Sequence, residues 1–354
     1  METKERIKGL IIGTAVGDSI GLPAEGISKR RNSLLFKGKW KHRFIFKYGM
    51  VSDDTEHTIF VCKSLLASSN SSESFAKKLS WHLRLWFLSL PPGIGFATLR
   101  ACIKLLMGFS FKRSGVYSAG NGPAMRAAPI GAFFSNDQEK IDDFIRCSTI
   151  ITHTDKRALI GAKAVAYISA LIVRENLSKK PSKAKFIGLL SSCDSENEEW
   201  NNIIKLLSEA IDKDMSVAEF ADIMNQGNGI SGYIFHTVPI VLYAWYNHFG
   251  DFKKTLSSIF NCGGDTDTTG AIAGALAGAV TGTQGIPNDW IQDIIDWPIS
   301  KNLIFKVAER LSEKISGNLR VSSFYYFWPF LILRNIFFIV IVFLHVIKRL
   351  IPPY

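Results

Sequence analysis

Apolar residues recur with a helical period along most of this chain. Runs in which an apolar side chain returns every three or four positions predict amphipathic helices, and the alternating runs typical of strands are few. The predicted helices cover residues 56–66, 74–90, 98–107, 156–175, 198–212, 217–226, 237–248 and 289–312. The pattern therefore predicts an all-α fold, with one compact domain from residue 1 to about 318.

Two of the helical segments also carry glycine at every fourth position. These glycines are Gly9, Gly13, Gly17 and Gly21 in the first segment, and Gly270, Gly274, Gly278 and Gly282 in the second. A four-residue interval places each set on one helix face, where a second backbone can approach closely. Because Asp18 interrupts the first set, we expect two crossed core helices of a soluble protein, and a membrane dimer is the alternative.

The class of protein is indicated by three features: the chain length, the cysteine spacing and the N-terminal sequence. A chain of 354 residues can bury a sizeable core without disulfides or a structural metal. Its five cysteines are widely spaced and form no CxxC pair, which argues against a disulfide framework or a zinc site. The N-terminus lacks the continuous apolar stretch of a signal peptide. We therefore expect a cytoplasmic protein, and a monomer.

Positive charge is in excess, with a formal net charge of +11. Basic clusters occur at residues 29–31 and 37–47. Such clusters are commonly solvated loop charges, and the alternative is attraction to an anionic target, a nucleotide or a lipid surface. Specific nucleic-acid binding is not expected.

Two acidic segments carry the candidate chemistry. Residues 52–55 read SDDT, which in isolation would be a common helix cap. Residues 261–270 read NCGGDTDTTG, where glycines deliver Asp265 and Asp267 to the start of the second glycine-rich helix. Carboxylates are the ligands that Mg²⁺ and Ca²⁺ prefer, and a pair of ions held by them can support hydrolysis. The spacing departs from that of an EF-hand.

A third segment ends the first glycine-rich helix at Pro23 and leaves Glu25 beyond it. If the two glycine-rich helices cross in the core, Glu25 comes close to the Asp265 loop. It could act there as a general base or an outer metal ligand, and an exposed glutamate without function is the alternative.

Taken together, five segments resemble the ADP-ribosylglycohydrolase family, of the dinitrogenase reductase-activating glycohydrolase type, in order and spacing. They are residues 17–26, 52–55, 120–131, 152–155 and 263–282, so the resemblance spans about residues 7–283. The specific feature is a GDTDT followed by a small-residue helix, far downstream of an SDDT. The resemblance implies an all-α fold with a binuclear magnesium or manganese centre in a cleft. It also implies a hydrolase that removes ADP-ribose from a modified protein or other acceptor.

Carried over residue by residue, the resemblance also implies roles for this chain's side chains. The metal ligands would be Ser52, Asp53, Asp54, Asp265, Asp267 and Thr268. The acid or base would be Glu25, Asp54 or Asp267, with Glu25 ranked first. Cleavage at the anomeric carbon builds positive charge on the ribose and needs an activated water, so an acid or base is required.

A glycine-containing segment, residues 118–126, matches the part of the family sequence that lines the ADP-ribose pocket. The substrate-binding residues would be Gly120, Asn121, Gly122, Met125 and, further along, His153 against the substrate's sugar. Glycines allow backbone N–H groups to approach a pyrophosphate, although Pro123 removes one such donor. Without the resemblance, these residues would be interpreted as a turn and a capping histidine.

The last segment, residues 319–354, is a hydrophobic tail outside the resemblance. Residues 324–347 comprise 24 positions, of which 17 are Leu, Ile, Val or Phe, so a helix here could cross about 30 Å of hydrocarbon. Arg334 near the centre opposes insertion. The tail could span a membrane, lie in its interface or pack on the enzyme. We expect residues 1–318 to fold and hydrolyse alone, and the full chain to attach to the cytoplasmic face of a membrane.

Two other functions remain open from the sequence. One is a catalytically silent, ADP-ribose-binding membrane protein, against which the intact acidic motifs argue. The other is a metal-dependent nucleotide phosphohydrolase. Arginine-, serine-, nucleic-acid- and acyl-linked ADP-ribose are all compatible with this cleft chemistry.

Overall fold

The computed structural model describes residues 1–68, 71–318, 321 and 323–350. These residues form nineteen α-helices and two short 3-10 helices, with no strand among them, so the predicted all-α class is confirmed. The first half contains α1 (Thr3–Gly21), η1 (Leu22–Ala24), α2 (Lys29–Phe36), α3 (Asp53–Ala67), α4 (Ser72–Leu88), α5 (Phe96–Leu106), α6 (Phe111–Ser114), α7 (Gly122–Met125), α8 (Ala128–Phe133) and α9 (Gln138–Ile150). The second half contains α10 (Lys156–Arg174), α11 (Lys183–Ser191), α12 (Glu198–Asp212), α13 (Val217–Ile223), α14 (Ile234–Asn247), α15 (Phe252–Phe260), α16 (Thr266–Thr281), η2 (Thr283–Gly285), α17 (Asn288–Gln292), α18 (Lys301–Ile315) and α19 (Phe330–Arg349).

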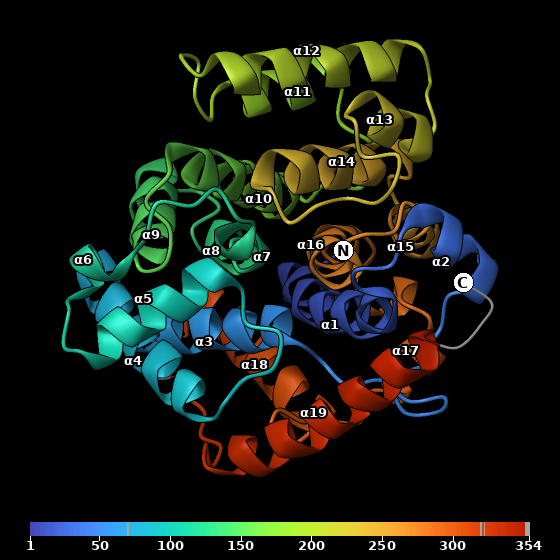
Figure 1. Ribbon diagram of the computed structural model, residues 1–354. Coiled ribbons are helices and arrows are strands. Elements are labelled where there is room, and N and C mark those ends of the chain that lie inside the picture. Colours follow the sequence, from blue (N-terminus) through green and yellow to red (C-terminus); the bar gives the residue numbers. More distant parts are fainter. Residues whose placement is uncertain (69–70, 319–320, 322, 351–354) are drawn as a thin grey trace.

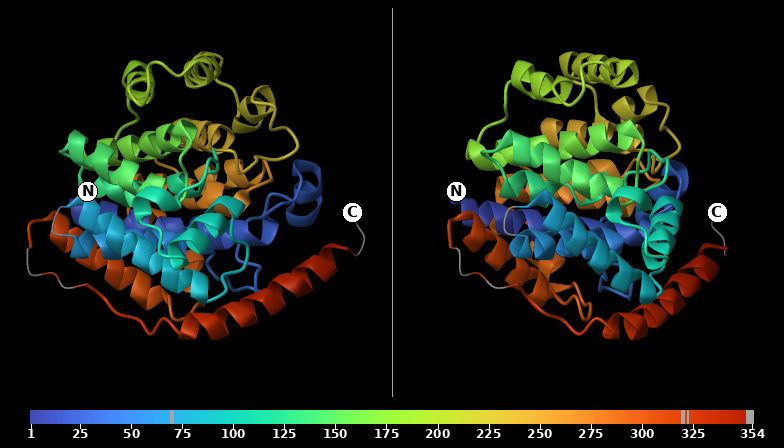
Figure 2. Two further views of the ribbon diagram at one scale, coloured as in Figure 1. Left: turned by 60° about the vertical axis from the view of Figure 1, so that its left-hand side comes forward. Right: turned by 90° about the vertical axis from the view of Figure 1, so that its left-hand side faces the viewer.

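The helices are arranged in layers around a central pair, α1 and α16 (Figure 1). On one side α10 and α14 pack against α16, and α11, α12 and α13 lie outside them. On the other side α3 and α18 pack against α1. The tail helix α19 lies along the outside of the body in both views of Figure 2. The pair α1 and α16 is therefore the centre of the molecule, with Glu25 just beyond α1, the Asp265 motif at the start of α16, and the SDDT motif at the start of α3.

The glycine stripes explain how closely this central pair packs. The two helices run antiparallel, so that Gly9 meets Gly278, Gly13 meets Gly274 and Gly17 meets Gly270. A Cβ atom added at Gly13 would lie 2.1 Å from the carbonyl oxygen of Gly274. No side chain fits at that distance, so the predicted crossing of two glycine-rich core helices is confirmed.

We expect Gly13→Ala to destabilise the fold by about 1–3 kcal/mol, because the added methyl group forces the two helices apart. Gly188→Ala in α11 is the matched control, since a Cβ there meets nothing within 4 Å. Removing this glycine should leave stability unchanged or raise it by up to about 1 kcal/mol. Urea unfolding measures both, and equal stabilities of the two variants would contradict the close crossing.

One helix prediction was wrong. Residues 289–312 were expected to form a single helix, but they form α17 and α18 with an irregular segment between them. Pro298 lies in that segment and lacks an N–H group, and it also disfavours the helical conformation of the residue before it. The interruption leaves the side chain of Asp296 free to accept a hydrogen bond from Val51 N, at 3.0 Å.

The tail contains a helix that by length and composition could cross a membrane, α19. Its buried residues are Leu331, Arg334, Asn335 and Phe338, which share one face. The predicted boundary between residues 318 and 319 falls beside residues 319–320, which lie outside the described part of the chain. The division into a body and a tail at that point stays a prediction.

Candidate functional site

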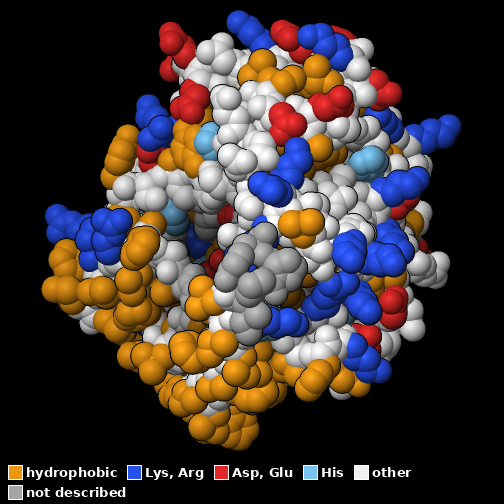
Figure 3. Space-filling view, turned by 45° about the vertical axis from the view of Figure 1, so that its right-hand side comes forward, with side chains coloured by type: hydrophobic (Ala, Val, Ile, Leu, Met, Phe, Trp, Pro, Cys, Tyr) orange, Lys and Arg blue, Asp and Glu red, His pale blue; other side chains and the backbone are white. Residues whose placement is uncertain are grey.

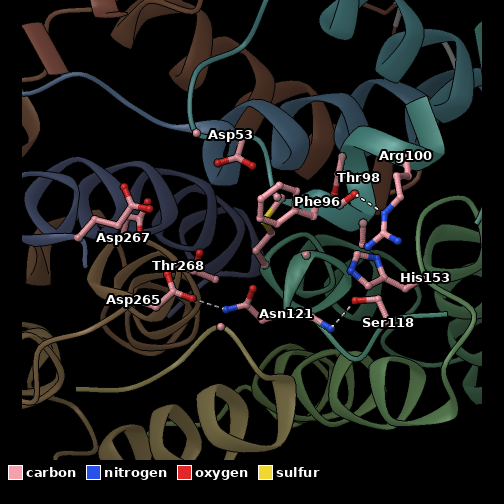
Figure 4. A pocket seen from close by; sticks show the side chains of 18 residues that line it. Asp53, Phe96, Thr98, Arg100, Ser118, Asn121, His153, Asp265, Asp267 and Thr268 are labelled. Carbon is pink, nitrogen blue, oxygen red and sulfur yellow. Dashed lines mark hydrogen bonds between the residues drawn. The ribbon is translucent and has the colours of Figure 1, made fainter. Parts of the chain in front are cut away.

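A cavity of about 420 Å³ opens where the loops before α3 and α16 meet α5 and the segment before α7 (Figure 4). Ten of the predicted site residues line it: Glu25, Asp53, Gly120, Asn121, Gly122, Met125, His153, Asp265, Asp267 and Thr268. Figure 4 shows the carboxylates of Asp53, Asp265 and Asp267 at one end of the cavity. His153 and Arg100 lie at the other end, with Asn121 between the two groups. The tertiary structure thus brings segments from most of the chain length into one pocket.

Ser52 and Asp54, two further predicted site residues, lie behind the acidic end of the cavity. Ser52 caps α3, and its hydroxyl donates to Asp54 Oδ2 at 3.1 Å. Thr268 Oγ1 donates to the same oxygen at 3.2 Å. The other oxygen of Asp54 is buried and has no hydrogen-bond partner among the described residues. Asp54 therefore joins the two acidic loops from within the protein.

Asp18 is a positioning residue that the sequence interpretation missed. It is fully buried, and its two carboxylate oxygens accept hydrogen bonds from Ser52 N at 3.0 and 2.9 Å. The backbone N–H of Thr55 donates to it as well, at 3.2 Å. Burial raises the pKa of Asp18 to about 6, against the lowering effect of these bonds. The sequence did contain one signal for this role. Asp18 lies among glycines that predict close helix packing, so its carboxylate was to be expected inside the protein, where it needs hydrogen-bond donors.

Among the described residues that line the cavity, the only lysine or arginine is Arg100, which lies at the end opposite the aspartates. Burial, followed by the charge of Asp18, raises the pKa of Asp53 well above its ordinary value. Burial and the charges of Glu25 and Asp265 do the same for Asp267, and its buried Oδ1 has no partner among the described residues. Mutual repulsion in a desolvated site makes full ionisation of these groups costly in the absence of a cation.

A divalent cation would relieve this repulsion, and the donor set suits one. The candidate ligands are hard oxygen donors, which Mg²⁺ and Mn²⁺ accept. Two of them, Asp54 and Asp267, present buried oxygens that lack other partners among the described residues. No group of three or more His, Cys, Asp or Glu side chains in the described part of the chain is close enough to count as an assembled metal site. The candidate ligands therefore suit a divalent cation by the chemistry of their donor atoms and by their charge.

Glu25 lies at the edge of the acidic end, in the loop after α1. That loop pairs with the loop before α16, since Gly26 N donates to Gly264 O at 2.8 Å. Desolvation, and then the charge of Asp265, raises the pKa of Glu25 to about 7, while Arg349 opposes the shift. The predicted approach of Glu25 to the Asp265 loop is therefore observed.

At the opposite end, two glycines allow the loop to pass against the imidazole of His153. A Cβ at Gly120 would lie 3.1 Å from His153 Nε2, and one at Gly122 would lie 3.2 Å from Cε1. His153 Nδ1 is 2.8 Å from Thr152 Oγ1, which also accepts a bond from Arg126. Burial and the charge of Arg126 lower the pKa of His153 to about 3. The lowered pKa favours the neutral form of His153 at physiological pH.

Asn121 connects the two ends of the cavity. Its Nδ2 donates to Asp265 Oδ2 at 2.6 Å and to Thr237 Oγ1 at 3.1 Å. The sequence interpretation missed the mouth of the cavity, which includes Phe96, exposed over 79% of its surface, and Arg100. Their segment carries no recognisable motif, so only their spatial position reveals them.

The family sequence model described as ADP-ribosylglycohydrolase matches residues 1–320. The chain belongs to the ADP-ribosylglycohydrolase family. The match extends beyond both ends of the expected range, residues 7–283. Family membership supports an activity that removes ADP-ribose by hydrolysis.

Two of the relatives match more than four fifths of the chain, and a third matches about half of it. An "Uncharacterized protein" of Archaeoglobus fulgidus is 30% identical over 319 residues, which cover 86% of this chain and 97% of that protein. The ADP-ribosyl-(dinitrogen reductase) glycohydrolase of Rhodospirillum rubrum is 28% identical, with coverage of 82% and 90%. The ADP-ribosylhydrolase ARH3 of Homo sapiens is 28% identical over 51% of this chain and 54% of its own length.

A solved structure, an ADP-ribosylglycohydrolase-related protein complex, has the same fold. Its TM-score to this chain is 0.62 at 24% sequence identity. The superposition covers 89% of this chain and 99% of the other.

Proposed function

We propose that this protein is a divalent-metal-dependent hydrolase that removes ADP-ribose from modified proteins in the cytoplasm. One observation carries the proposal: carboxylates from two distant loops converge at one end of a cavity, while Arg100, the only lysine or arginine in its described lining, lies at the other end. The name of the Rhodospirillum rubrum relative specifies a modified protein as its target, which supports a protein substrate.

The proposed ligands of two Mg²⁺ or Mn²⁺ ions are Ser52, Asp53, Asp54, Asp265, Asp267 and Thr268. Asp53, Asp265, Asp267 and Thr268 line the cavity, whereas Ser52 and Asp54 support them from behind. When bound, such ions would lower the pKa of a bound water and hold the ribose hydroxyls.

The cavity suits ADP-ribose because its two ends differ in chemistry. The reacting ribose would lie at the acidic end, and the pyrophosphate would lie toward the Gly120–Gly122 loop and Arg100. Backbone N–H groups of a glycine loop and a guanidinium are ordinary phosphate-binding groups. Arg100, and not the neutral His153, supplies the positive charge at this end.

Glu25 is the proposed general base. Cleavage breaks the bond between the anomeric carbon and the acceptor and forms a bond from that carbon to water oxygen. Glu25 accepts the water proton and passes it to the departing acceptor, so that the acceptor leaves protonated and Glu25 returns to its ionised form. A pKa of about 7 keeps part of the Glu25 population ionised at neutral pH.

We expect Glu25→Gln to lower kcat by about 10²–10⁴-fold, because the amide cannot accept the water proton. Metal affinity should change little, which the shift of Tm with added Mg²⁺ reports. Glu196→Gln, in another exposed loop, is the matched control and should leave kcat unaltered. A normal kcat in Glu25→Gln would remove Glu25 from the reaction.

The function itself is tested with the full-length protein, Mg²⁺ and a panel of defined ADP-ribosyl linkages. Release of free ADP-ribose from at least one modified protein supports the proposal and identifies the linkage. Release of inorganic phosphate from nucleotides instead would indicate a phosphohydrolase. Binding of ADP-ribose without any turnover would indicate a catalytically silent binding protein.

A further inference from the structure

The tail helix α19 is attached to the body through buried hydrogen bonds and a buried ion pair. Arg334 is fully buried, and its guanidinium donates to both carboxylate oxygens of Asp296, at 3.1 and 2.8 Å. The same guanidinium donates to Val51 O and lies 3.6 Å from Glu56. The adjacent Asn335 donates to Ser89 O at 2.9 Å. These bonds determine which face of α19 points inward.

The opposite face of α19 is apolar and open to solvent. Its large exposed side chains include Leu333, Ile336, Phe337, Val340, Phe343 and Leu344. Leu333 and Phe343 keep more than 60% of their surface exposed, at 62% and 63%. An arginine-anchored helix with this outer face is amphipathic, although its sequence resembles a membrane span.

Exposed apolar side chains of the body extend this surface. Leu90 follows Ser89, to which α19 is bonded, and the ring of Trp297 lies 5.3 Å from that of Phe337. Phe46 is 93% exposed and lines a groove next to α19. Figure 3 shows hydrophobic side chains gathered over the lower part of the molecule. An apolar patch of this extent marks an interaction surface.

Positive charge borders the same surface. The groove beside α19, about 470 Å³ in volume, has an apolar floor that includes Phe44, Ile341 and Leu344. Lys41, Arg43 and Lys348 also line it, and its described lining includes no aspartate or glutamate. Lysine and arginine side chains lie next to the hydrophobic patch in Figure 3. Apolar groups beside a cationic rim match the acyl chains and phosphates of an anionic lipid surface.

We propose that the exposed face of α19 and the adjoining cationic groove bind the surface of an anionic phospholipid bilayer, with α19 lying flat in the headgroup region. A spanning orientation would withdraw Arg334 and Asn335 from their partners and leave Asp296 and Glu56 buried without a counter-charge. A second copy of the chain would bring two identical cationic grooves together, and like charges repel. The flat orientation on lipid keeps every observed contact.

Binding of the full-length protein to lipid vesicles tests whether an anionic bilayer is the partner of this surface. The protein should sediment with vesicles that contain phosphatidylglycerol. A smaller fraction of the protein should sediment with pure phosphatidylcholine vesicles. The triple variant Phe337→Glu, Val340→Glu, Leu344→Glu should bind about 100-fold more weakly or worse, because apolar burial drives insertion. Ile223→Glu changes an exposed apolar residue on α13 and is the matched control.

The cationic groove is tested separately with Lys41→Glu, Arg43→Glu and Lys348→Glu combined. Binding to phosphatidylglycerol vesicles should fall about 100-fold, while binding to phosphatidylcholine should not change. An unaltered Tm for each variant shows that the fold is intact. Absence of binding to anionic vesicles would overturn the proposal, as would a concentration-dependent dimer that does not bind them.

The orientation of α19 is tested by depth measurements at three positions on its outer face. Leu333, Val340 and Ile347 are seven residues apart, exposed and on one side of the helix. Single cysteines at these positions can be labelled with an environment-sensitive dye, since all five native cysteines are buried. Quenching by nitroxide lipids should place the three labels at equal, shallow depth. A deep Val340 label between two shallow labels would show a span and would overturn the flat orientation.

Discussion

Asp267→Asn is expected to abolish ADP-ribose release and, at the same time, to raise the stability of the metal-free protein. The carboxylate of Asp267 is buried among other acids, so its ionised form opposes folding at neutral pH. A neutral amide of the same shape removes that repulsion. It also removes a proposed metal ligand, and a contribution of several kcal/mol by such a ligand to the transition state corresponds to about 10³-fold or more in rate.

Loss of activity together with a gain in metal-free stability would indicate that Asp267 binds a metal. An acid with only a structural role would not give both effects. Tm without metal should rise in Asp267→Asn, and the increase of Tm on adding Mg²⁺ should disappear. Asp265→Ala and Asp267→Ala should also lose turnover and the Mg²⁺ response. Asp289→Asn, an exposed carboxylate on α17, should change none of these quantities. Near-normal turnover in both alanine variants would rule out the proposed centre.

Arg334→Met should destabilise the protein by about 3–5 kcal/mol, because it leaves Asp296 and Glu56 buried without their counter-charge. The loss is measured by urea unfolding of the full-length protein. Activity should fall with it, since Arg334 donates to Val51 O directly before the candidate ligand Ser52. The added change Asp296→Asn should restore part of the stability, because it removes one of the orphaned charges.

The destabilisation by Arg334→Met should also depend on pH. Burial raises the pKa of Glu56 to about 7, and Arg334 lowers it from a still higher value. A carboxyl group whose pKa is raised by folding costs no stability below its unfolded pKa and costs progressively more as pH rises. The deficit of the variant should therefore be smaller near pH 5 than near pH 8. A pH-independent deficit would show that packing, rather than charge, explains the effect.

The contacts of Arg334 also affect what is expected when the tail is removed. That residues 1–318 fold and hydrolyse alone stays a prediction, but the shorter chain lacks the cation that faces Asp296 and Glu56. Near the end of α19, Arg349 donates to Glu25 O at 3.2 Å and to Pro23 O at 2.8 Å. Since the loop before α3 and the segment that carries Glu25 each have a bond to α19, we expect the shorter chain to be less active than the full chain.

The sequence alone determined the features that depend on local order. Helical periodicity predicted the all-α class, and residues 198–212 form α12 with the predicted bounds. The four-residue glycine interval predicted the α1–α16 crossing, because only backbone without side chains can approach so closely. The acidic motifs and the resemblance together identified ten residues that line one cavity. Helical periodicity and each glycine interval are local patterns, and the resemblance rests on the order and spacing of short motifs along the chain.

The tertiary structure alone decided where buried charges find their partners. Asp18 bonds to a residue 34 positions away, and Arg334 bonds to Asp296 and Val51 across 38 and 283 positions. In the sequence, Asp18 was only an interruption of a glycine stripe, and Arg334 only a cost to membrane insertion. A buried charge is stabilised by whichever opposite charge the chain path brings within hydrogen-bond distance, and that path follows from the packing of all the helices together.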